Sequence, residues 1–220
     1  MELTMSPLLQ MNHVIVRRSA RSVLSGVDLT LHEGERLVIR GGIGTGKTTL
    51  LLTALGLLTH DEGEISLFGQ RCRHDDDFAP FRGKVGLLFQ DPDDQLIGPT
   101  VLEDVEFGPL NLGWSARRAH AAADAAIESV GLESLALRPV HELSGGEKRL
   151  AALAGLLAME PTLLLLDEPT ASLDDETAQR ILGVLQASGL AMLIATHDQR
   201  CAEALGTRSM TLGQGRLYPA

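Results

Sequence analysis

Aromatic and basic residues are both scarce in this chain of 220 residues. Five Phe, one Tyr and one Trp make up 3% of the sequence, whereas proteins that bind single-stranded nucleic acid stack bases on aromatic side chains. Nineteen Lys and Arg face 29 Asp and Glu, which gives a formal net charge of −10. A surface that neutralises a phosphate backbone needs the opposite balance, so both deficits argue against a nucleic-acid partner.

Cysteines are also few, and no apolar run is long enough to cross a membrane. Cys72 and Cys201 lie far apart and fit neither a disulfide framework nor a zinc site, which is typical of a reducing compartment. The longest apolar runs, Leu50 to Leu58 and Leu150 to Met159, are about half of the ~20 residues that a spanning helix needs. Met1 to Asn12 lacks the basic start of a signal peptide. We therefore expect a cytoplasmic protein, and any membrane role would belong to another chain.

Apolar residues are abundant enough for a folded core, at 44% against 22% charged. The first part of the chain is rich in strand-forming residues. Val14 to Val16, Val27 to Leu31 and Arg36 to Arg40 alternate apolar and polar residues between turns at Ser25-Gly26 and Glu33-Gly34. This pattern predicts a small antiparallel region that leads into a buried strand.

The remaining strands and the first helix follow from composition and length. Leu163 to Leu166 and Ala191 to Ala195 are continuous apolar runs, as expected for strands covered on both faces of a parallel sheet. Further strands are predicted at Glu64 to Phe68 and Val85 to Phe89, and a helix at Thr48 to Leu58.

Residues 90–143 have a different composition, with several prolines and the alanine-rich stretch Ala116 to Val130, and they predict loops plus at least one helix. We expect a single α/β domain over residues 1–220. It would have a mainly parallel core sheet, an antiparallel β subdomain and a helical subdomain inserted at about 90–143.

A phosphate-binding loop follows the strand Arg36 to Arg40. The segment from Gly41 to Thr48 matches the pattern G-x-x-x-x-G-K-[ST], between a strand and a helix as the mechanism requires. Glycines let the backbone N–H groups converge on an anion at the helix N-terminus, Lys47 adds a point charge, and the Thr48 hydroxyl suits Mg²⁺. The residues predicted to bind nucleotide here are Gly41, Gly42, Ile43, Gly44, Thr45, Gly46, Lys47, Thr48 and Thr49.

Two carboxylates end the leucine-rich strand, where open α/β sheets bind ligands. Asp167 is predicted to hold Mg²⁺ through its water shell, and Glu168 to orient or deprotonate the attacking water. Taken alone, Asp-Glu followed by Pro169 is equally consistent with an acidic turn, and only the phosphate loop upstream favours the catalytic interpretation.

A second candidate anion site is Ser144-Gly145-Gly146. Ser144 and Glu147 form the pattern of a capping box, which explains the segment structurally. Two glycines at a helix start also leave N–H groups exposed at the positive end of the helix dipole, as an anion site requires. The local sequence leaves both interpretations open.

Together these motifs resemble the ATP-binding cassette (ABC) ATPases. The phosphate loop, Leu-Ser-Gly-Gly, Leu-Leu-Leu-Leu-Asp-Glu-Pro-Thr and Thr196-His197 occur in the family's order across almost the whole chain. The resemblance implies an ATPase whose two subunits pair head to tail, with Ser144, Gly145 and Gly146 of one closing on the γ-phosphate held by the other. It assigns Gln90 to sensing Mg²⁺ and the attacking water, and His197 to contacting the γ-phosphate.

The chain departs from that family in places. Where an aromatic residue usually lies under adenine, it has Val16-Arg17-Arg18, and Arg17 is a candidate for stacking on the base. Asp174, in contrast, matches the family: it stands where the family makes a dimer contact, although it also fits a helix cap. The sequence stops at Ala220, whereas many relatives continue with a C-terminal dimerisation segment. We therefore expect a pair that tightens and loosens with ATP, either a homodimer or a heterodimer.

The stretch from Phe89 to Val101 and the one from Glu103 to Gly113 are similar to energy-coupling-factor importers, especially their cobalt and nickel branch. That similarity implies a peripheral ATPase at the cytoplasmic face of the membrane, with a transmembrane coupling protein and a membrane substrate-binding subunit. Residues 93–113 would form a groove for the coupling helices.

Four alternatives remain. The cargo could be biotin or another vitamin. A cassette acting on nucleic acid or the ribosome is disfavoured by charge and aromatic content, and a P-loop phosphotransferase has no use for the Leu-Ser-Gly-Gly element. Cys72, His74 and Asp75 to Asp77 could hold a metal, but a polar surface loop is the simpler interpretation.

Overall fold

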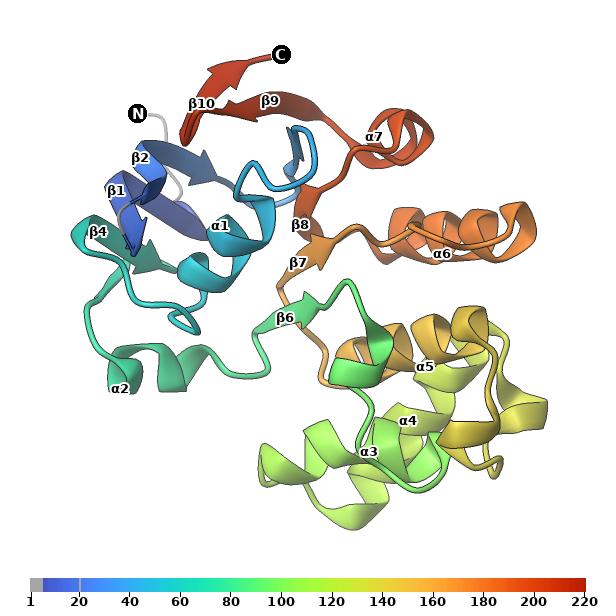
Figure 1. Ribbon diagram of the computed structural model, residues 1–220. Helices are drawn as coiled ribbons and strands as arrows, with labels where there is room; N and C mark the ends of the chain where they lie inside the picture. Colours follow the sequence, from blue (N-terminus) through green and yellow to red (C-terminus); the bar gives the residue numbers. More distant parts are fainter. Residues whose placement is uncertain (1–5, 20) are drawn as a thin grey trace, which may run out of the picture.

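The computed structural model describes residues 6–19 and 21–220, and it places two β-sheets on either side of one helix (Figure 1). The strands are β1 (Leu9–Arg18), β2 (Arg21–Leu31), β3 (Arg36–Arg40), β4 (Glu62–Leu67), β5 (Gln70–Cys72), β6 (Val85–Leu88), β7 (Leu163–Asp167), β8 (Ala191–Ala195), β9 (Arg208–Gly213) and β10 (Arg216–Pro219). The helices are α1 (Lys47–Ala54), α2 (Asp75–Phe78), α3 (Val101–Asn111), α4 (Ala116–Val130), α5 (Gly145–Leu157), α6 (Asp175–Ser188) and α7 (Gln199–Leu205).

The larger sheet has the strand order β10-β9-β3-β8-β7-β6. Neighbours from β9 to β6 pair in parallel, and β10 pairs antiparallel with β9. Strands β6, β7 and β8 are buried along their whole length, which explains why their sequences are continuous apolar runs. The predicted parallel core is therefore present, with an antiparallel strand at one edge.

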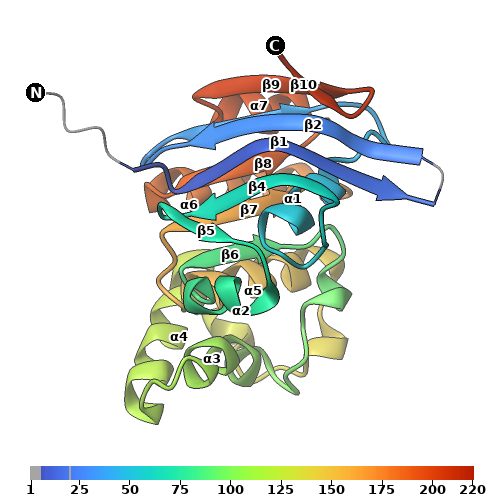
Figure 2. The same ribbon diagram turned by 90° about the vertical axis from the view of Figure 1, so that its left-hand side faces the viewer.

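The smaller sheet is antiparallel, in the order β2-β1-β4-β5, and it faces the viewer in Figure 2. Its β1 and β2 are longer than the segments predicted from alternation, because β1 begins earlier with the buried Leu9 and Met11 and both strands include exposed residues at the hairpin end. Helix α1 lies between the two sheets, and its Leu50 and Leu51 share one apolar core with Leu37 of β3 and Leu24 of β2.

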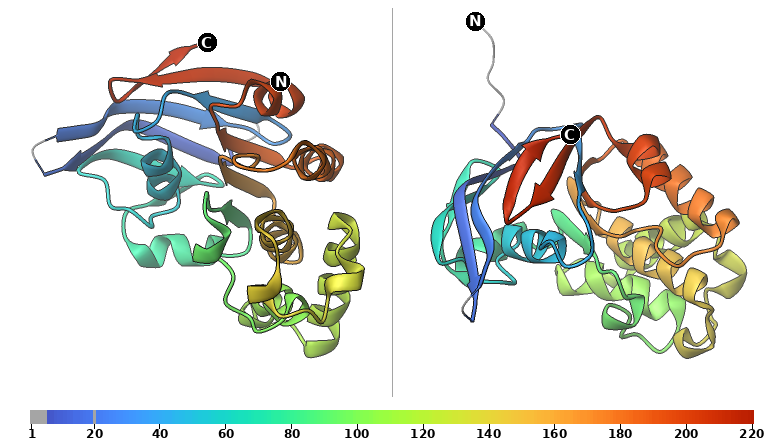
Figure 3. Two further views of the ribbon diagram at one scale, coloured as in Figure 1. Left: turned by 45° about the vertical axis from the view of Figure 1, so that its right-hand side comes forward. Right: turned by 45° about the horizontal axis from the view of Figure 1, so that its top comes forward.

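The other face of the large sheet is covered by helices, with a second apolar core that includes Leu164, Met192 and Ile194. Helices α3, α4 and α5 pack on one another and extend away from the sheets (Figures 1 and 3). The predicted helix at Ala116 to Val130 is confirmed as α4; Ser115 caps its start and Gly131 its end. Its buried face includes Ala119 and Ala123, whose small side chains let the neighbouring helices approach closely.

Two local predictions were wrong. Helix α1 ends at Ala54 and not at Leu58, because the chain turns at Gly56 with a φ of +71° and the Leu57 and Leu58 amides bond back to Leu52. The polar loop before β6 contains the short strand β5 and the one-turn helix α2. Over residues 90–143, where loops plus at least one helix were predicted, the structure has both α3 and α4, and Pro109 lies inside the last turns of α3.

The parallel arrangement brings four strand ends to one edge of the large sheet. The phosphate loop follows β3, Gln90 follows β6, Glu168 follows β7 and His197 follows β8. Residues that are up to 156 positions apart in numbering, such as Gly41 and His197, thus follow adjacent strands. Open α/β sheets bind their ligands at this edge.

None of the helices formed by residues 6–19 and 21–220 is long and apolar enough to cross a membrane. The prediction that no signal peptide is present falls partly on residues 1–5, which lie outside the described residues.

Both cysteines are unpaired and buried, Cys72 in the core between the sheets and Cys201 in the core under the helices. Burial raises the pKa of the Cys201 thiol to about 12 and also raises the pKa of Cys72. Because the thiolate is the reactive species, we expect neither cysteine of the native protein to react with iodoacetamide at pH 8, and both to react in denaturant. Mass spectrometry of the alkylated protein measures this; modification of the native chain would contradict the buried placement.

Candidate active site

The phosphate loop has the backbone shape that its glycines predict. Gly44 has a φ of +75° and Gly46, which caps the start of α1, a φ of +105°, both in the region that favours glycine. A Cβ at Gly46 would also lie 3.0 Å from the side chain of Val23, so the loop packs tightly against β2. The Thr45 hydroxyl donates to the Gly42 carbonyl at 2.9 Å and holds the turn. The loop is therefore a preformed cradle of N–H groups at a helix N-terminus.

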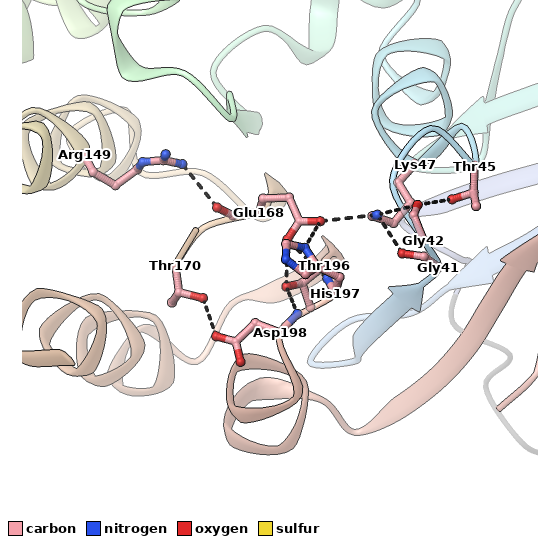
Figure 4. Close-up of polar contacts among 10 residues, drawn as sticks. All are labelled: Gly41, Gly42, Thr45, Lys47, Arg149, Glu168, Thr170, Thr196, His197 and Asp198. Carbon is pink, nitrogen blue, oxygen red and sulfur yellow. Dashed lines mark hydrogen bonds and ion pairs between the residues drawn. The ribbon is translucent and has the colours of Figure 1, made fainter. Parts of the chain in front are cut away.

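Lys47 lies in the first turn of α1, and its side chain bends back over the loop (Figure 4). Its ammonium donates to the Gly41 carbonyl at 2.9 Å and to the Gly42 carbonyl at 3.2 Å. It also lies 3.3 Å from a carboxylate oxygen of Glu168, with both side chains almost fully buried. The cation is thus already placed between the phosphate loop and the candidate base.

Glu168 accepts hydrogen bonds at both carboxylate oxygens (Figure 4). Thr196 donates its hydroxyl at 3.0 Å, and His197 lies with Nδ1 2.8 Å from one oxygen and its backbone N–H 3.2 Å from the other. Burial acts to raise the pKa of Glu168, but these bonds and Lys47 outweigh it, and the pKa lies below its usual value. Glu168 is therefore a carboxylate at neutral pH, as a proton acceptor must be.

The backbone of Glu168 is in an unusual conformation, with a φ of +48°. A non-glycine residue in the left-handed region is uncommon and costs about 1–3 kcal/mol. The carbonyl of Glu168 accepts from Arg149, and its amide donates to the Ala195 carbonyl at 2.8 Å, so the neighbouring strand and helix hold this conformation. Strain held in this way is typical of a functional position.

Asp167 and Thr48 offer hard oxygen atoms next to the phosphate loop. Asp167 is 3% exposed, and among the described residues its Oδ1 is buried with no hydrogen-bond partner. Burial raises the pKa of Asp167, and a hydrogen bond with Thr48 opposes that shift. A buried carboxylate oxygen without a partner beside a hydroxyl fits a divalent cation, so the residues present suit Mg²⁺.

A cavity of about 650 Å³ joins this pair to the other candidate residues. Its lining includes Thr48, Gln90 and Asp167, together with Gly145 and Arg149 of α5. The residues predicted to bind Mg²⁺, Thr48 and Asp167, therefore line the same cavity as Gln90, which was predicted to sense Mg²⁺ and the attacking water. Gln90 is exposed, and its carbonyl accepts from the Arg149 guanidinium.

The capping box predicted at the start of α5 is confirmed. The Ser144 hydroxyl accepts from the Glu147 amide at 3.3 Å, and the Ser144 amide donates to the Glu147 carboxylate at 2.7 Å. The latter bond lowers the pKa of Glu147. The exposed Gly145 and the half-buried Gly146 follow the cap, so the capping role leaves an anion-binding role of the same helix end open.

Other predicted residues lie farther out. Arg17 is half exposed on β1, with its guanidinium 2.5 Å from Glu62. Ile43 is 95% exposed at the tip of the phosphate loop, and Thr49 is half-buried in α1. Asp174 caps α6 by accepting from the Thr177 amide at 2.9 Å, which confirms its structural role.

Sequence reasoning gave no role to two residues of the site. Thr196 is buried and bonds to Glu168, and its position directly before His197 at the end of β8 could have indicated this. Arg149 is buried with three backbone carbonyls as partners, and nothing in its local sequence distinguishes it from the exposed cations expected on a helix.

Residues 24–171 match the family described as ABC transporter. The chain belongs to this family. An ABC transporter ATP-binding protein of Brucella suis, whose name states no cargo, is 49% identical over 98% of this chain and 90% of its own length. The energy-coupling factor transporter ATP-binding protein EcfA of Methanothermobacter thermautotrophicus is 41% identical over 88% of this chain and 64% of its own length. The cobalt import ATP-binding protein CbiO of Rhodobacter capsulatus is 43% identical over 88% of this chain and 71% of its own length.

Among solved structures, a dimeric ATP-binding cassette in a post-hydrolysis state with ADP and Pi aligns with a TM-score of 0.85 and 30% identity. The alignment covers 95% of this chain and 96% of that one. The predicted ABC resemblance, its energy-coupling-factor branch and the α/β fold are confirmed, and the cassette is an ATPase subunit of a transporter.

Replacing Lys47 tests the phosphate loop directly. We expect Lys47→Ala to abolish measurable ATP binding, because the variant removes the cation at the loop and leaves the buried Glu168 without its ion pair. Isothermal titration calorimetry measures the affinity. Lys84→Ala is the matched control, since Lys84 lies over the Phe68 ring away from the loop. Unchanged ATP affinity of a folded Lys47→Ala protein would refute the assignment.

Proposed function

We propose that this cassette is the ATP-hydrolysing subunit of an energy-coupling-factor importer that takes up cobalt or nickel ions. The observation that carries the proposal is an apolar cavity next to the Gln90 loop, suited to a helix from a membrane partner. The relative CbiO, which is named for cobalt import, supports this choice of cargo. Biotin or another vitamin is the alternative.

ATP binding would begin with the exchange of partners at Lys47. The ammonium now bonds to two loop carbonyls and to Glu168, and phosphate oxygens entering the loop would replace them. Gly41 to Thr49 would surround the phosphates. Thr48, Gln90 and Asp167 would hold Mg²⁺, and the ion when bound would offset the negative charge of the phosphates.

Hydrolysis would use the carboxylate of Glu168 as the proton acceptor for the attacking water. Thr196 and the His197 backbone fix one of its oxygens, so the other oxygen, which faces Lys47 and the His197 ring, is the one to accept the proton. The His197 side chain is more than half exposed, and it would contact the γ-phosphate.

Arg17 would take the place of the aromatic residue under adenine. It pairs with Ser22 across the β1–β2 hairpin, and the next residue, Val23, contacts Gly46 of the phosphate loop. The guanidinium is half exposed and forms an ion pair with Glu62 of β4. A planar guanidinium can stack on a base.

The second subunit would be another copy of this chain, paired head to tail when ATP is bound. Ser144, Gly145 and Gly146 would then reach the γ-phosphate held by the partner copy. The dimeric cassette with ADP and Pi supports this arrangement, and the free N–H groups at the start of α5 supply its chemistry.

The membrane partner would dock in the apolar cavity, which has a volume of about 550 Å³. The cavity lies between α3 and α5, with Phe107 on one side and Leu156 and Met159 on the other. Ile97 and Phe107 are 65% and 46% exposed although large and apolar. Asp104 accepts from the Ile97 and Gly98 amides at 2.7 Å, which fixes the loop that presents Ile97.

This cavity also borders the nucleotide site, since Phe89 and Gln95 line it one residue and five residues from Gln90. A helix seated there could sense movement of the Gln90 loop. The partners would be a transmembrane coupling protein and a membrane substrate-binding subunit. The cassette itself would lie at the cytoplasmic face of the membrane.

Removing the proton acceptor should arrest the cycle in the paired state. We expect Glu168→Gln to bind Mg·ATP and form a stable dimer, since the amide keeps the shape of the side chain but cannot take the proton. Multi-angle light scattering with excess Mg·ATP measures the mass, and Glu203→Gln on the surface of α7 is the control. A Glu168→Gln protein that binds ATP yet stays monomeric would contradict self-pairing and favour a different partner subunit.

Capture from native membranes tests the importer. The tagged protein, purified from detergent-solubilised membranes, should bring down a helical coupling protein and a metal-binding membrane subunit, identified by mass spectrometry. Phe107→Glu should lose them, because a charge would enter the apolar cavity. Tyr218→Glu is the control, since Tyr218 on β10 is equally exposed but outside the cavity. A vitamin-binding subunit would change the cargo, and soluble or ribosomal partners alone would refute the importer.

A further inference from the structure

Arg149, in the first half of α5, is 5% exposed and reaches into the region between two strand ends. Its guanidinium donates to the Phe89 carbonyl at 3.2 Å, to the Gln90 carbonyl at 2.5 Å and to the Glu168 carbonyl at 3.3 Å. One side chain therefore joins a helix to the ends of β6 and β7, and Figure 4 shows its approach to Glu168.

The cation is held by carbonyl dipoles and not by a direct ion pair. Among residues 6–19 and 21–220, no carboxylate lies within ion-pair distance of Arg149, and its buried Nε has no hydrogen-bond partner. Burial lowers the pKa of Arg149, while the more distant charges of Asp91 and Asp167 act against this shift. A buried charge without a close counter-ion is costly, and an apolar side chain of similar volume would often be more favourable for stability alone. The arginine therefore needs a reason beyond packing.

The three carbonyls that the Arg149 guanidinium binds suggest this reason. Two belong to Phe89 and Gln90, at the start of the loop that carries the proposed water sensor, and the third belongs to the proposed base itself. Two further contacts fix the same loop to α5: Lys148 lies 2.6 Å from Asp93, and the Gln95 side chain donates to the Ala152 carbonyl at 3.3 Å. Of these three links to α5, only Arg149 also reaches Glu168.

We propose that Arg149 is a positioning residue for ATP hydrolysis, which keeps Gln90 and Glu168 in fixed relation to each other and to α5. Movement of α5 toward a partner subunit would then carry both backbone segments with it. The side chain touches neither nucleotide nor water and acts through the carbonyls it binds. The inference rests on the roles proposed above for Gln90 and Glu168, and is independent of the importer's cargo.

Kinetics of the purified cassette test the proposal with Arg149→Met, which fills a similar volume, and Arg149→Lys, which keeps the charge. We expect kcat to fall at least about tenfold in Arg149→Met while the affinity for ATP changes less than about threefold, because only the geometry of the reacting groups is lost. Lysine cannot donate to three carbonyls in a planar fork, so Arg149→Lys should restore only part of kcat. Arg118→Lys and Arg118→Met on α4 are the matched controls, and thermal melting verifies folding.

A double-mutant cycle distinguishes positioning from general stability. If Arg149 acts through the Gln90 loop, Gln90→Ala combined with Arg149→Lys should lose little more kcat than the worse single variant. Additive losses, or a kcat within about twofold of wild type in folded Arg149→Met, would overturn the proposal.

Hydrogen exchange gives a second readout that needs no turnover. On adding Mg·ATP, segments 41–49, 89–95 and 145–157 of the wild type should gain protection together. Folded Arg149→Met should keep the gain at 41–49 and lose the linked gain at 145–157. Retained protection of all three segments in this variant would refute the coupling. Absence of any ATP effect at 41–49 in the wild type would instead count against the nucleotide site itself, so the two failures are distinguishable.

Discussion

The site depends on one constraint, the parallel pairing of β3, β8, β7 and β6. Parallel neighbours end at the same edge, so four segments that are remote in sequence deliver a cation, two carboxylates, an amide and an imidazole to one place. In the observed register Leu163 lies beside Ala191 and Asp167 beside Ala195, so that the end of β7 is level with the end of β8. The chemistry is therefore a consequence of how Leu163–Asp167 and its neighbours pack, and no single loop could provide it.

Asp167 and Glu168 show how one strand end supports two chemical roles. They are adjacent in sequence, yet burial raises the pKa of Asp167, whereas four hydrogen-bonding or charged contacts lower that of Glu168. The left-handed backbone at Glu168 directs its side chain toward Lys47 and His197, and Asp167 faces Thr48. Separated environments of this kind allow one carboxylate to serve a metal and the other a proton.

Much of this was predictable from the sequence where local pattern and tertiary role coincide. The continuous apolar runs at Leu163 and Ala191, the glycines of the phosphate loop and the Ser144–Glu147 box each carry a local physical reason for their structure, and each was predicted. Helix α3 received no bounds of its own because Pro109 in its sequence argues against a helix, and the turn at Gly56 that ends α1 leaves no room for a side chain beside Phe78. Such features are decided by distant parts of the chain.

Sequence reasoning identified Lys47, Asp167 and Glu168, but neither Arg149 nor the burial that all four charges share. Four charged side chains are buried among the described residues, namely Lys47, Arg149, Asp167 and Glu168, and all of them line or adjoin the same site. Each would be cheaper to keep in water, and a core without them would be easier to pack. Lys47 and Glu168 offset this cost in each other, whereas Asp167 and Arg149 each retain a buried polar atom without a partner. Both of these groups line the cavity that Gln90 also lines. This distribution is expected of a site whose charges are balanced only when a polyanion, its cation and a water molecule are in place.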